Sequence, residues 1–120
     1  MSKRVLVADD SSTMRKIILR SLHAVGVTEA TEAADGAEAV EIFKRGNFDL
    51  VLTDWNMPAK SGLEVISEIR AINKTVPIIM VTTEAEKSRL MEAIKAGVSD
   101  YLIKPFTADT LREKLEKHGC

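Results

Sequence analysis

The sequence predicts a single α/β domain built as a (βα)5 doubly wound parallel sheet. The chain has 120 residues, which is close to the usual size of one domain. Five short apolar runs alternate along it with longer segments of helical periodicity. Four of these runs are almost continuously apolar, which is typical of strands that are buried on both faces of a parallel sheet.

The apolar runs predict strands at residues 5–8, 27–30, 50–52, 78–81 and 101–103. The second run contains Thr28 and Glu29, so we expect this strand at an edge of the sheet. Right-handed crossovers between parallel strands place helices on both faces. The strand order 2-1-3-4-5 leaves the mixed strand at the edge, whereas 3-2-1-4-5 would bury it. We therefore expect the order 2-1-3-4-5.

The segments between the runs predict helices. The clearest apolar stripe has helical spacing and consists of Met14, Ile17, Ile18, Ser21, Leu22 and Val25. Four further stripes comprise Ala39, Val40 and Phe43; Leu63, Ile66 and Ile69; Leu90, Met91 and Ile94; and Leu111 and Leu115. The segments 61–64 and 83–86 match the capping box of a helix start. Glycines follow three stripes, where a left-handed residue often ends a helix: Gly26, Gly46 and Gly97.

Composition and charge exclude several functional classes. The net charge of −1 gives no global attraction to DNA or to an anionic membrane. The single cysteine, Cys120, excludes an internal disulfide and offers no metal-site spacing. The apolar runs are too short for a membrane span or for a signal peptide. We therefore expect one cytoplasmic, monomeric domain over residues 1–120, with neither DNA nor membrane as partner.

Polar side chains follow the ends of the four central strands. Asp9 and Asp10 come after the first run, and Asp54 comes after the third. Thr82 ends the fourth run, and Lys104 follows the fifth. The carboxyl ends of parallel strands share one edge of the sheet, and ligands bind there where the winding direction reverses. We expect these side chains to converge at that edge.

Three clustered carboxylates repel one another and raise each other's pKa unless a cation neutralises them. Oxygen ligands without His or Cys select Mg²⁺, or Mn²⁺, rather than zinc. Lys104 and Thr82 are then suited to bind phosphoryl oxygens. The pattern indicates phosphoryl transfer to a carboxylate nucleophile. Asp54 is the best candidate, because it alone lies between the acidic pair and the Thr/Lys pair.

Four segments carry a family resemblance. They are Val-Ala-Asp-Asp-Ser-Ser-Thr-Met-Arg at 7–15, Thr-Asp-Trp-Asn-Met-Pro at 53–58, Met-Val-Thr at 80–82 and Ile-Lys-Pro-Phe at 103–106. In this order and spacing they resemble the receiver domain of two-component response regulators, over the whole chain. That resemblance implies a flavodoxin-like fold. With Val-Thr-Thr-Glu-Ala at 81–85, the combination most resembles the stand-alone chemotaxis regulators.

The resemblance implies a role for each residue of the site. Asp54 would accept a phosphoryl group from a phosphohistidine on a sensor kinase. The side chains of Asp10 and Asp54 and the backbone carbonyl of Asn56 would bind Mg²⁺, with Asp9 acting largely through water. Lys104 would pair with a phosphoryl oxygen, and its peptide bond to Pro105 resembles the cis bond of the family. Such a protein is not an enzyme beyond self-phosphorylation from small donors and self-dephosphorylation.

The resemblance also implies a switch and an output surface. Thr82 would bond a second phosphoryl oxygen, and Tyr101 would turn inward when Thr82 moves. Asn56 and Glu84 occupy the positions that tune dephosphorylation. The output surface would involve the fourth helix, the fifth strand and the fifth helix, with Ala85, Leu90, Tyr101 and Lys114. Leu90 has a second interpretation as part of the buried stripe of its helix. The implied partners are a chemotaxis-type histidine kinase, a flagellar motor switch protein and a phosphatase.

The sequence departs from the family pattern in two segments, and other functions remain open. Ala59-Lys60-Ser61-Gly62 replaces the more usual acidic or polar residue followed by Asp-Gly, and Lys60 is expected to place a positive charge near the site. Thr83 replaces a frequent Ala, and its bulk could narrow access to Asp54. One alternative is a receiver domain cut from a larger regulator. Another is a phosphatase of the haloacid dehalogenase type, although Asn56 stands where that class has a second acid. A flavin-binding protein is disfavoured, because three acids would repel the FMN phosphate.

Overall fold

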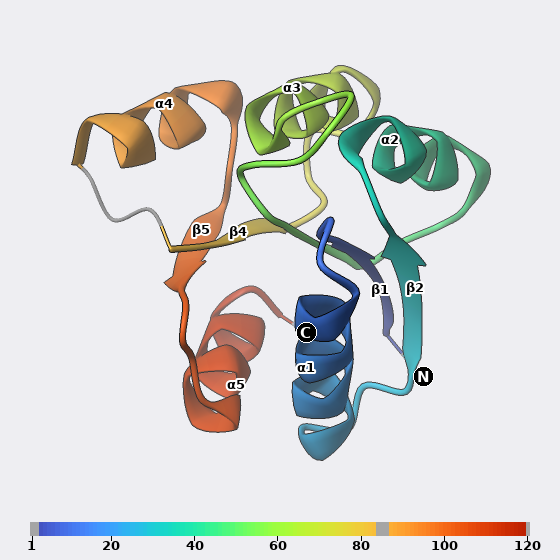
Figure 1. Cartoon of the computed structure of the whole chain (residues 1–120), viewed down its shortest axis with the longest axis vertical. Coiled ribbons are helices and arrows are strands. Elements are labelled where there is room, and N and C mark those ends of the chain that lie inside the picture. The colour runs from blue at the N-terminus through green and yellow to red at the C-terminus, as the bar shows by residue number, and fades with distance from the viewer. Residues whose placement is uncertain (1–2, 84–86, 120) are drawn as a thin grey trace.

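Strands and helices alternate strictly in residues 3–83 and 87–119, which the computed structural model describes (Figure 1). The strands are β1 (Arg4–Ala8), β2 (Glu29–Ala33), β3 (Leu50–Thr53), β4 (Ile78–Thr82) and β5 (Asp100–Ile103). The helices are α1 (Ser12–Ala24), α2 (Gly36–Arg45), α3 (Gly62–Ile72), α4 (Lys87–Ala96) and α5 (Ala108–Lys117). All strand pairs are parallel, and the order β2-β1-β3-β4-β5 confirms the prediction. Within the described ranges, none of the helices combines the length and apolarity needed to cross a membrane.

The sheet separates two apolar layers. Helices α1 and α5 cover one face, and α2, α3 and α4 cover the other (Figure 1). Val5 and Val7 point into the first layer, whereas Leu6 and Ala8 of the same strand point into the second. Side chains alternate in this way along any strand, so a strand between two helix layers must be apolar throughout. The packed layers hold the central strands in place, and the loops at their carboxyl ends carry the polar side chains.

The edge strand β2 lies further along the chain than predicted. It covers Glu29–Ala33 rather than 27–30, and its register runs from Arg4 opposite Glu29 to Ala8 opposite Ala33. Val27 is buried against the end of α1, where its N–H donates to the carbonyl of Leu22 at 2.9 Å. The apolar character of Val27 therefore reflects helix packing and not strand pairing.

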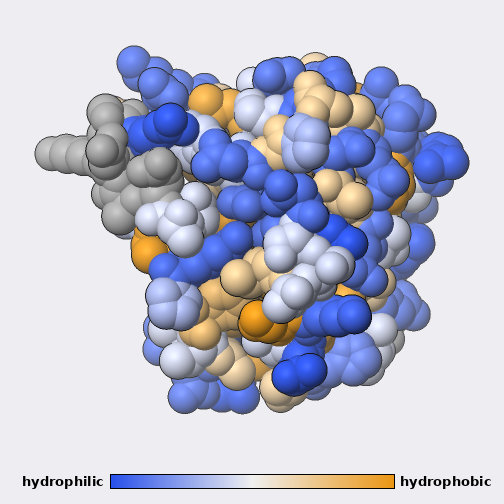
Figure 2. Space-filling model, viewed as in Figure 1, coloured by the Kyte–Doolittle hydropathy of each residue, from blue (hydrophilic) through white to orange (hydrophobic). Residues whose placement is uncertain are grey.

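Helix α4 presents a different face to the core than its apolar residues predict. Ala93 is buried and Leu90 is half-buried, but Met91 is 47% exposed and Ile94 is 55% exposed. The prediction of a buried stripe was therefore wrong for Met91 and Ile94, because α4 turns Ala93 and not these side chains toward the apolar layer that it shares with α3. Ile17 of the predicted α1 stripe is also 43% exposed. In Figure 2, small areas of hydrophobic residues lie among predominantly hydrophilic ones on the face drawn.

The helix starts agree in part with the predicted caps. The Ser61 hydroxyl accepts a hydrogen bond from the N–H of Glu64 at 3.3 Å, which caps α3. A reciprocal capping box occurs instead at α5, between Thr107 and Thr110. Sequence reasoning missed it because Thr at the third position replaces the usual Glu or Gln. The predicted box at 83–86 extends into residues outside the described ranges.

Two of the three expected left-handed glycines are confirmed. Gly26 has φ 92° and Gly97 has φ 109°. Gly46 ends α2 in an extended conformation with φ −121°, so the prediction was wrong there. A Cβ atom at this position would lie 2.8 Å from the ring of Phe48, so a larger residue would require this ring to shift.

Candidate functional site

The acidic residues that follow β1 and β3 lie together at the carboxyl edge of the sheet. One carboxylate oxygen each from Asp9, Asp10 and Asp54 lies within 4.8 Å of the others. The two strands are neighbours, with Ala8 opposite Thr53. Asp9 is buried, Asp54 is half-buried and Asp10 is exposed. The fold thus places the acids where the strand pattern predicts them.

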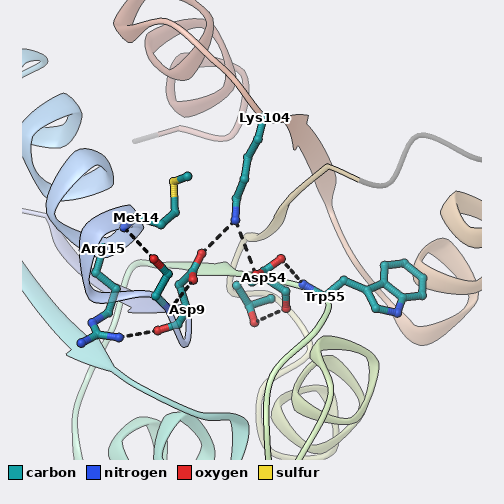
Figure 3. A network of polar contacts seen from close by, with 8 residues as sticks. Asp9, Met14, Arg15, Asp54, Trp55 and Lys104 are labelled. Atoms are coloured by element: carbon teal, nitrogen blue, oxygen red, sulfur yellow. Dashed lines mark hydrogen bonds and ion pairs between the residues drawn. The ribbon is translucent and has the colours of Figure 1, made fainter.

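Lys104 reaches this cluster from the end of β5. Its Nζ lies 2.9 Å from Oδ2 of Asp9 and 3.5 Å from Oδ2 of Asp54 (Figure 3). The Lys104 side chain is only 11% exposed, and its backbone N–H donates to the carbonyl of Thr82 at 2.9 Å. The Lys104-Pro105 peptide is cis, as the family resemblance implies. A single ammonium group therefore partly neutralises two carboxylates from two other strands.

Asp9 is held at both its backbone and its side chain. Its N–H donates to the carbonyl of Ala33 at 3.1 Å, and its carbonyl accepts from Nη1 of Arg15 at 2.6 Å. Oδ1 accepts from the N–H of Ser11 at 2.9 Å, and Oδ2 faces Lys104. Both oxygens of the Asp9 carboxylate therefore have partners within the protein.

The backbone around Asp54 is tightly enclosed. The N–H of Asp54 donates to the carbonyl of Ala8 at 2.9 Å, and Oδ1 of Asp54 accepts from the N–H of Trp55 at 2.7 Å. The backbone of Gly62 lies against this segment, and its N–H donates to the carbonyl of Trp55 at 2.7 Å. Trp55 is 3% exposed, and its indole points away from the acidic cluster (Figure 3).

The electrostatics of Asp54 depend on its two nearest charged neighbours. Burial raises the pKa of Asp54 above its ordinary value, Lys104 opposes this rise, and the Asp9 carboxylate adds to it. Carboxylate oxygens, without a sulfur or imidazole ligand in the cluster, fit a hard divalent cation such as Mg²⁺ or Mn²⁺. A second cation would favour the ionised form of all three acids.

The remaining predicted positions around the cluster differ in exposure. Thr82 is 1% exposed at the end of β4, whereas Asn56 and Thr83 are exposed. Lys60 forms an ion pair with Glu68 on α3, with Nζ and Oε2 at 2.6 Å. The expected positive charge beside the site is therefore neutralised within the protein.

The predicted output residues lie only in part within the described ranges. Tyr101 is 37% exposed, and Nζ of Lys114 lies 5.4 Å from the centre of its ring. Leu90 is half-buried. Ala85 and Glu84 lie outside the described residues. Tyr101 and Lys114 are thus adjacent on the surface of β5 and α5.

Sequence reasoning missed a second charged cluster at the start of β5. Asp100, 8% exposed, pairs with Lys114 at 2.9 Å, His118 at 3.0 Å and Lys117 at 3.3 Å. Burial alone would raise the pKa of Asp100, but hydrogen bonds from Lys114, His118 and neighbouring groups outweigh this and lower it well below its ordinary value. The available signal was the acid that begins an apolar strand, with two lysines of α5 and the following His118 located 14 to 18 residues later.

Comparisons with known proteins agree with this geometry. The family model described as a response regulator receiver domain matches residues 5–116. The chain is 46% identical over 116 residues to chemotaxis protein CheY-3 of Vibrio cholerae, covering 95% of this chain and 89% of that protein. It is also 46% identical to CheY of Pseudomonas aeruginosa, covering 95% of this chain and 94% of the relative.

Solved structures share the fold at lower sequence identity. CheY4 of Vibrio cholerae superposes with a TM-score of 0.91 at 34% identity, covering 98% of both chains. The receiver domain of a Pseudomonas aeruginosa sensor histidine kinase, with magnesium coordinated in its active site cleft, has a TM-score of 0.90 at 31% identity, covering 100% of both chains.

These similarities establish the general function. A receiver domain of the CheY type is a phosphorylation-activated response regulator, a signalling protein rather than a classical enzyme. Receiver domains bind Mg²⁺ in an acidic pocket, and the aspartate cluster supplies such a pocket here. They act between a histidine kinase and a downstream target. The fold, the acidic edge and the matching family model together show that the chain belongs to the response regulator receiver domain family.

Proposed function

We propose that Asp54 is the phosphoacceptor of this receiver domain. The supporting observation is the position of its carboxylate, with Oδ1 bonded to the N–H of Trp55 and Oδ2 facing Lys104 at 3.5 Å. Asp9 is less suited, because it is 1% exposed and both of its carboxylate oxygens already have partners. Asp10 is exposed, and no ion pair with Lys104 is found for it among the described residues.

The transfer would exchange one bond to phosphorus for another. The phosphoryl group passes from the imidazole nitrogen of a kinase phosphohistidine to a carboxylate oxygen of Asp54. The P–N bond breaks, the P–O bond forms, and the leaving imidazole takes up a proton. Lys104, now bonded to Asp9, would turn to a phosphoryl oxygen, and the hydroxyl of Thr82 would donate to another.

We propose the same acidic cluster as the site of the divalent cation. Asp9, Asp10 and Asp54, with the backbone carbonyl of Asn56, would hold Mg²⁺. When bound, Mg²⁺ neutralises charge on the phosphoryl oxygens as they approach the carboxylates. The chain's own residues keep the acceptor in position, since Trp55 and Gly62 fix the backbone beside Asp54. Asn56 and Glu84 would set the rate of self-dephosphorylation.

The acceptor assignment is tested with a small phosphodonor. Acetyl phosphate with Mg²⁺ should add one labile phosphoryl group to the wild type, detected by mass spectrometry. Asp54→Asn should remove it, while Asp109→Asn at an exposed aspartate should not. A phosphoryl group that persists in the Asp54→Asn variant would show that another residue is the acceptor.

We also propose chemotaxis as the process served. The kinase would be of the chemotaxis type, the target would be a flagellar motor switch protein, and residues 1–120 would act as one monomeric domain in the cytoplasm. The relatives from Vibrio cholerae and Pseudomonas aeruginosa are chemotaxis proteins. Exposed apolar side chains on α4 and β5 support an output surface there, namely Met91, Ile94 and Tyr101.

The target assignment is tested with a motor switch peptide. Its affinity should rise at least about tenfold when Asp54 carries a stable phosphoryl mimic, which is a coupling of about 1.4 kcal/mol. Tyr101→Ala and Lys114→Ala should reduce this gain, whereas Ile17→Ala on α1 should not, although Ile17 is similarly exposed. Equal affinity in both states would favour the alternative of a receiver domain from a different, larger regulator.

A further inference from the structure

One side chain outside the acidic cluster holds the backbone on which two of its members lie. Arg15, one turn into α1, donates from Nη1 to the carbonyl of Asp9 at 2.6 Å. Its Nε donates to Oε1 of Glu32 on β2 at 2.9 Å. The Arg15 side chain is 15% exposed and points toward Asp9 (Figure 3). A single guanidinium group therefore connects the end of β1, helix α1 and strand β2.

This contact bears on Asp10 more than on Asp9. The Asp9 carboxylate is already held by the N–H of Ser11 and by Lys104. The Asp10 carboxylate is exposed, and in the described part of the chain it accepts no hydrogen bond. The carbonyl of Asp9 and the nitrogen of Asp10 belong to one planar peptide. Holding that carbonyl therefore holds the peptide plane, and with it the Asp10 nitrogen and Cα from which the Asp10 side chain extends.

The ion pair with Glu32 makes the positively charged Arg15 side chain compatible with a metal site beside it. An unpaired guanidinium beside the acids would repel a divalent cation. Glu32 neutralises the charge of Arg15 and at the same time orients its planar donor group. Arg15 would also keep its contact with the Asp9 carbonyl after Lys104 has left the Asp9 carboxylate for a phosphoryl group.

We propose that Arg15, oriented by Glu32, is a positioning residue that holds Asp10 in place for Mg²⁺. This inference rests on the proposed metal site at Asp9, Asp10 and Asp54. Groups that orient metal ligands commonly contribute about 10- to 100-fold to metal affinity. Because the contact is made to the backbone, the low end of that range applies.

The test removes the contact without changing the net charge. The double variant Arg15→Met/Glu32→Gln loses one charge of each sign; Gln keeps the length of Glu32, and Met keeps the apolar stem of Arg15 without its guanidinium group. Its Mg²⁺ dissociation constant, followed by Trp55 fluorescence and amide NMR shifts, should rise about tenfold. The matched control Arg112→Gln/Asp109→Asn removes an exposed ion pair on α5 and should leave the constant unchanged. Denaturation curves without Mg²⁺ establish that both variants are folded.

Two further variants separate positioning from general destabilisation. In an Asp10→Ala background, the double change should add almost nothing, because the group that it positions is absent. Arg15→Lys keeps the charge and the helix, but a point ammonium cannot replace the planar donor group, so Mg²⁺ affinity should still fall.

The outcomes distinguish this inference from the proposed function. If the double variant binds Mg²⁺ with wild-type affinity, the role of Arg15 is overturned but the metal site is not. The same holds if the double change weakens Mg²⁺ binding just as much in the Asp10→Ala background. Absence of any Mg²⁺ response in the wild type overturns the metal site itself, and the inference with it.

Discussion

The ammonium of Lys104 lies 2.9 Å from the buried carboxylate of Asp9, in a position where it would compete with the proposed divalent cation for the same oxygens. The Asp9 side chain is 2% exposed and the Lys104 side chain is 11% exposed, so solvent screens this pair little. Lys104 also faces Asp54 at 3.5 Å. It thereby stabilises the cluster in the absence of metal, and it is within reach of a group bound to Asp54.

We expect Lys104→Met to strengthen Mg²⁺ binding and to weaken the metal-free fold. Removing the competing cation should tighten Mg²⁺ binding about fivefold, near 1 kcal/mol. Unpaired buried acids should lower the free energy of unfolding by about 3 kcal/mol without Mg²⁺, and saturating Mg²⁺ should restore part of it. Fluorescence titration measures the Mg²⁺ affinity, and denaturation without Mg²⁺ and at saturating Mg²⁺ measures the free energy of unfolding. Lys95→Met, at an exposed lysine of α4, serves as the control. Weaker Mg²⁺ binding in Lys104→Met would contradict the competition.

Gly62→Ala should disturb Asp54 through the backbone. A Cβ atom at Gly62 would overlap the carbonyl oxygen of Asp54 and would lie 3.0 Å from Cα of Trp55. Because these are backbone atoms, the loop must shift, which should cost about 2–3 kcal/mol of unfolding free energy. Phosphorylation by acetyl phosphate should slow as the acceptor moves. Gly119→Ala also introduces local strain, since Gly119 has φ 78°, but its Cβ would point into open space beyond α5, so this variant should keep the wild-type phosphorylation rate.

Ala59 offers a stabilising substitution. Its φ of 68° is left-handed, and no other non-glycine residue of the described chain has a positive φ. Asn tolerates this conformation better than Ala does, so Ala59→Asn should raise the free energy of unfolding by about 0.5–1 kcal/mol. Ala59→Val should lower it by about 1–2 kcal/mol. Denaturant midpoints with unchanged slopes measure both effects. If Ala59→Asn lowers the free energy of unfolding, the backbone at Ala59 is not strained. As a control, Ala71→Asn in helix α3 measures the effect of the same substitution at a position with ordinary helical φ.

Asp100 should contribute stability that disappears in acid. Its pKa in the folded protein lies well below the ordinary value of 3.8, so the contribution is complete above that value and is lost as the pH falls through the folded pKa. Asp100→Asn should lower the free energy of unfolding at pH 7 by about 1–2 kcal/mol. The difference from the wild type should narrow below about pH 4. Urea denaturation across this range measures it. The exposed Asp109→Asn should change stability by less than about 0.5 kcal/mol, and a pH-independent difference for Asp100→Asn would contradict the linkage.

Much of the site could be predicted from local patterns. Continuous apolar runs identify buried parallel strands, and right-handed crossovers then restrict the strand order. The carboxyl ends of such strands meet at one edge, so Asp9, Asp10 and Asp54 had to lie near one another and near Lys104. These conclusions need only residue type and spacing, because the geometry of a parallel sheet supplies the rest.

Other features of the structure depend on how the helices pack on the sheet and on which side chains come into contact. The position of β2, the exposure of Met91 and Ile94, and the pairing of Lys60 with Glu68 are set by neighbouring elements. Apolar character alone does not distinguish a residue buried by a strand from one buried by a helix end, as Val27 shows.

The amino-acid sequence by itself determined the fold class, the strand order and the identity of the acidic cluster with its lysine. Only the tertiary structure decided that Arg15 bonds to the Asp9 carbonyl and that Asp100 pairs with Lys114, Lys117 and His118. The physical reason is that the first set follows from periodicity along the chain. The second set follows from side-chain conformation and register between elements, which become defined only when the layers pack.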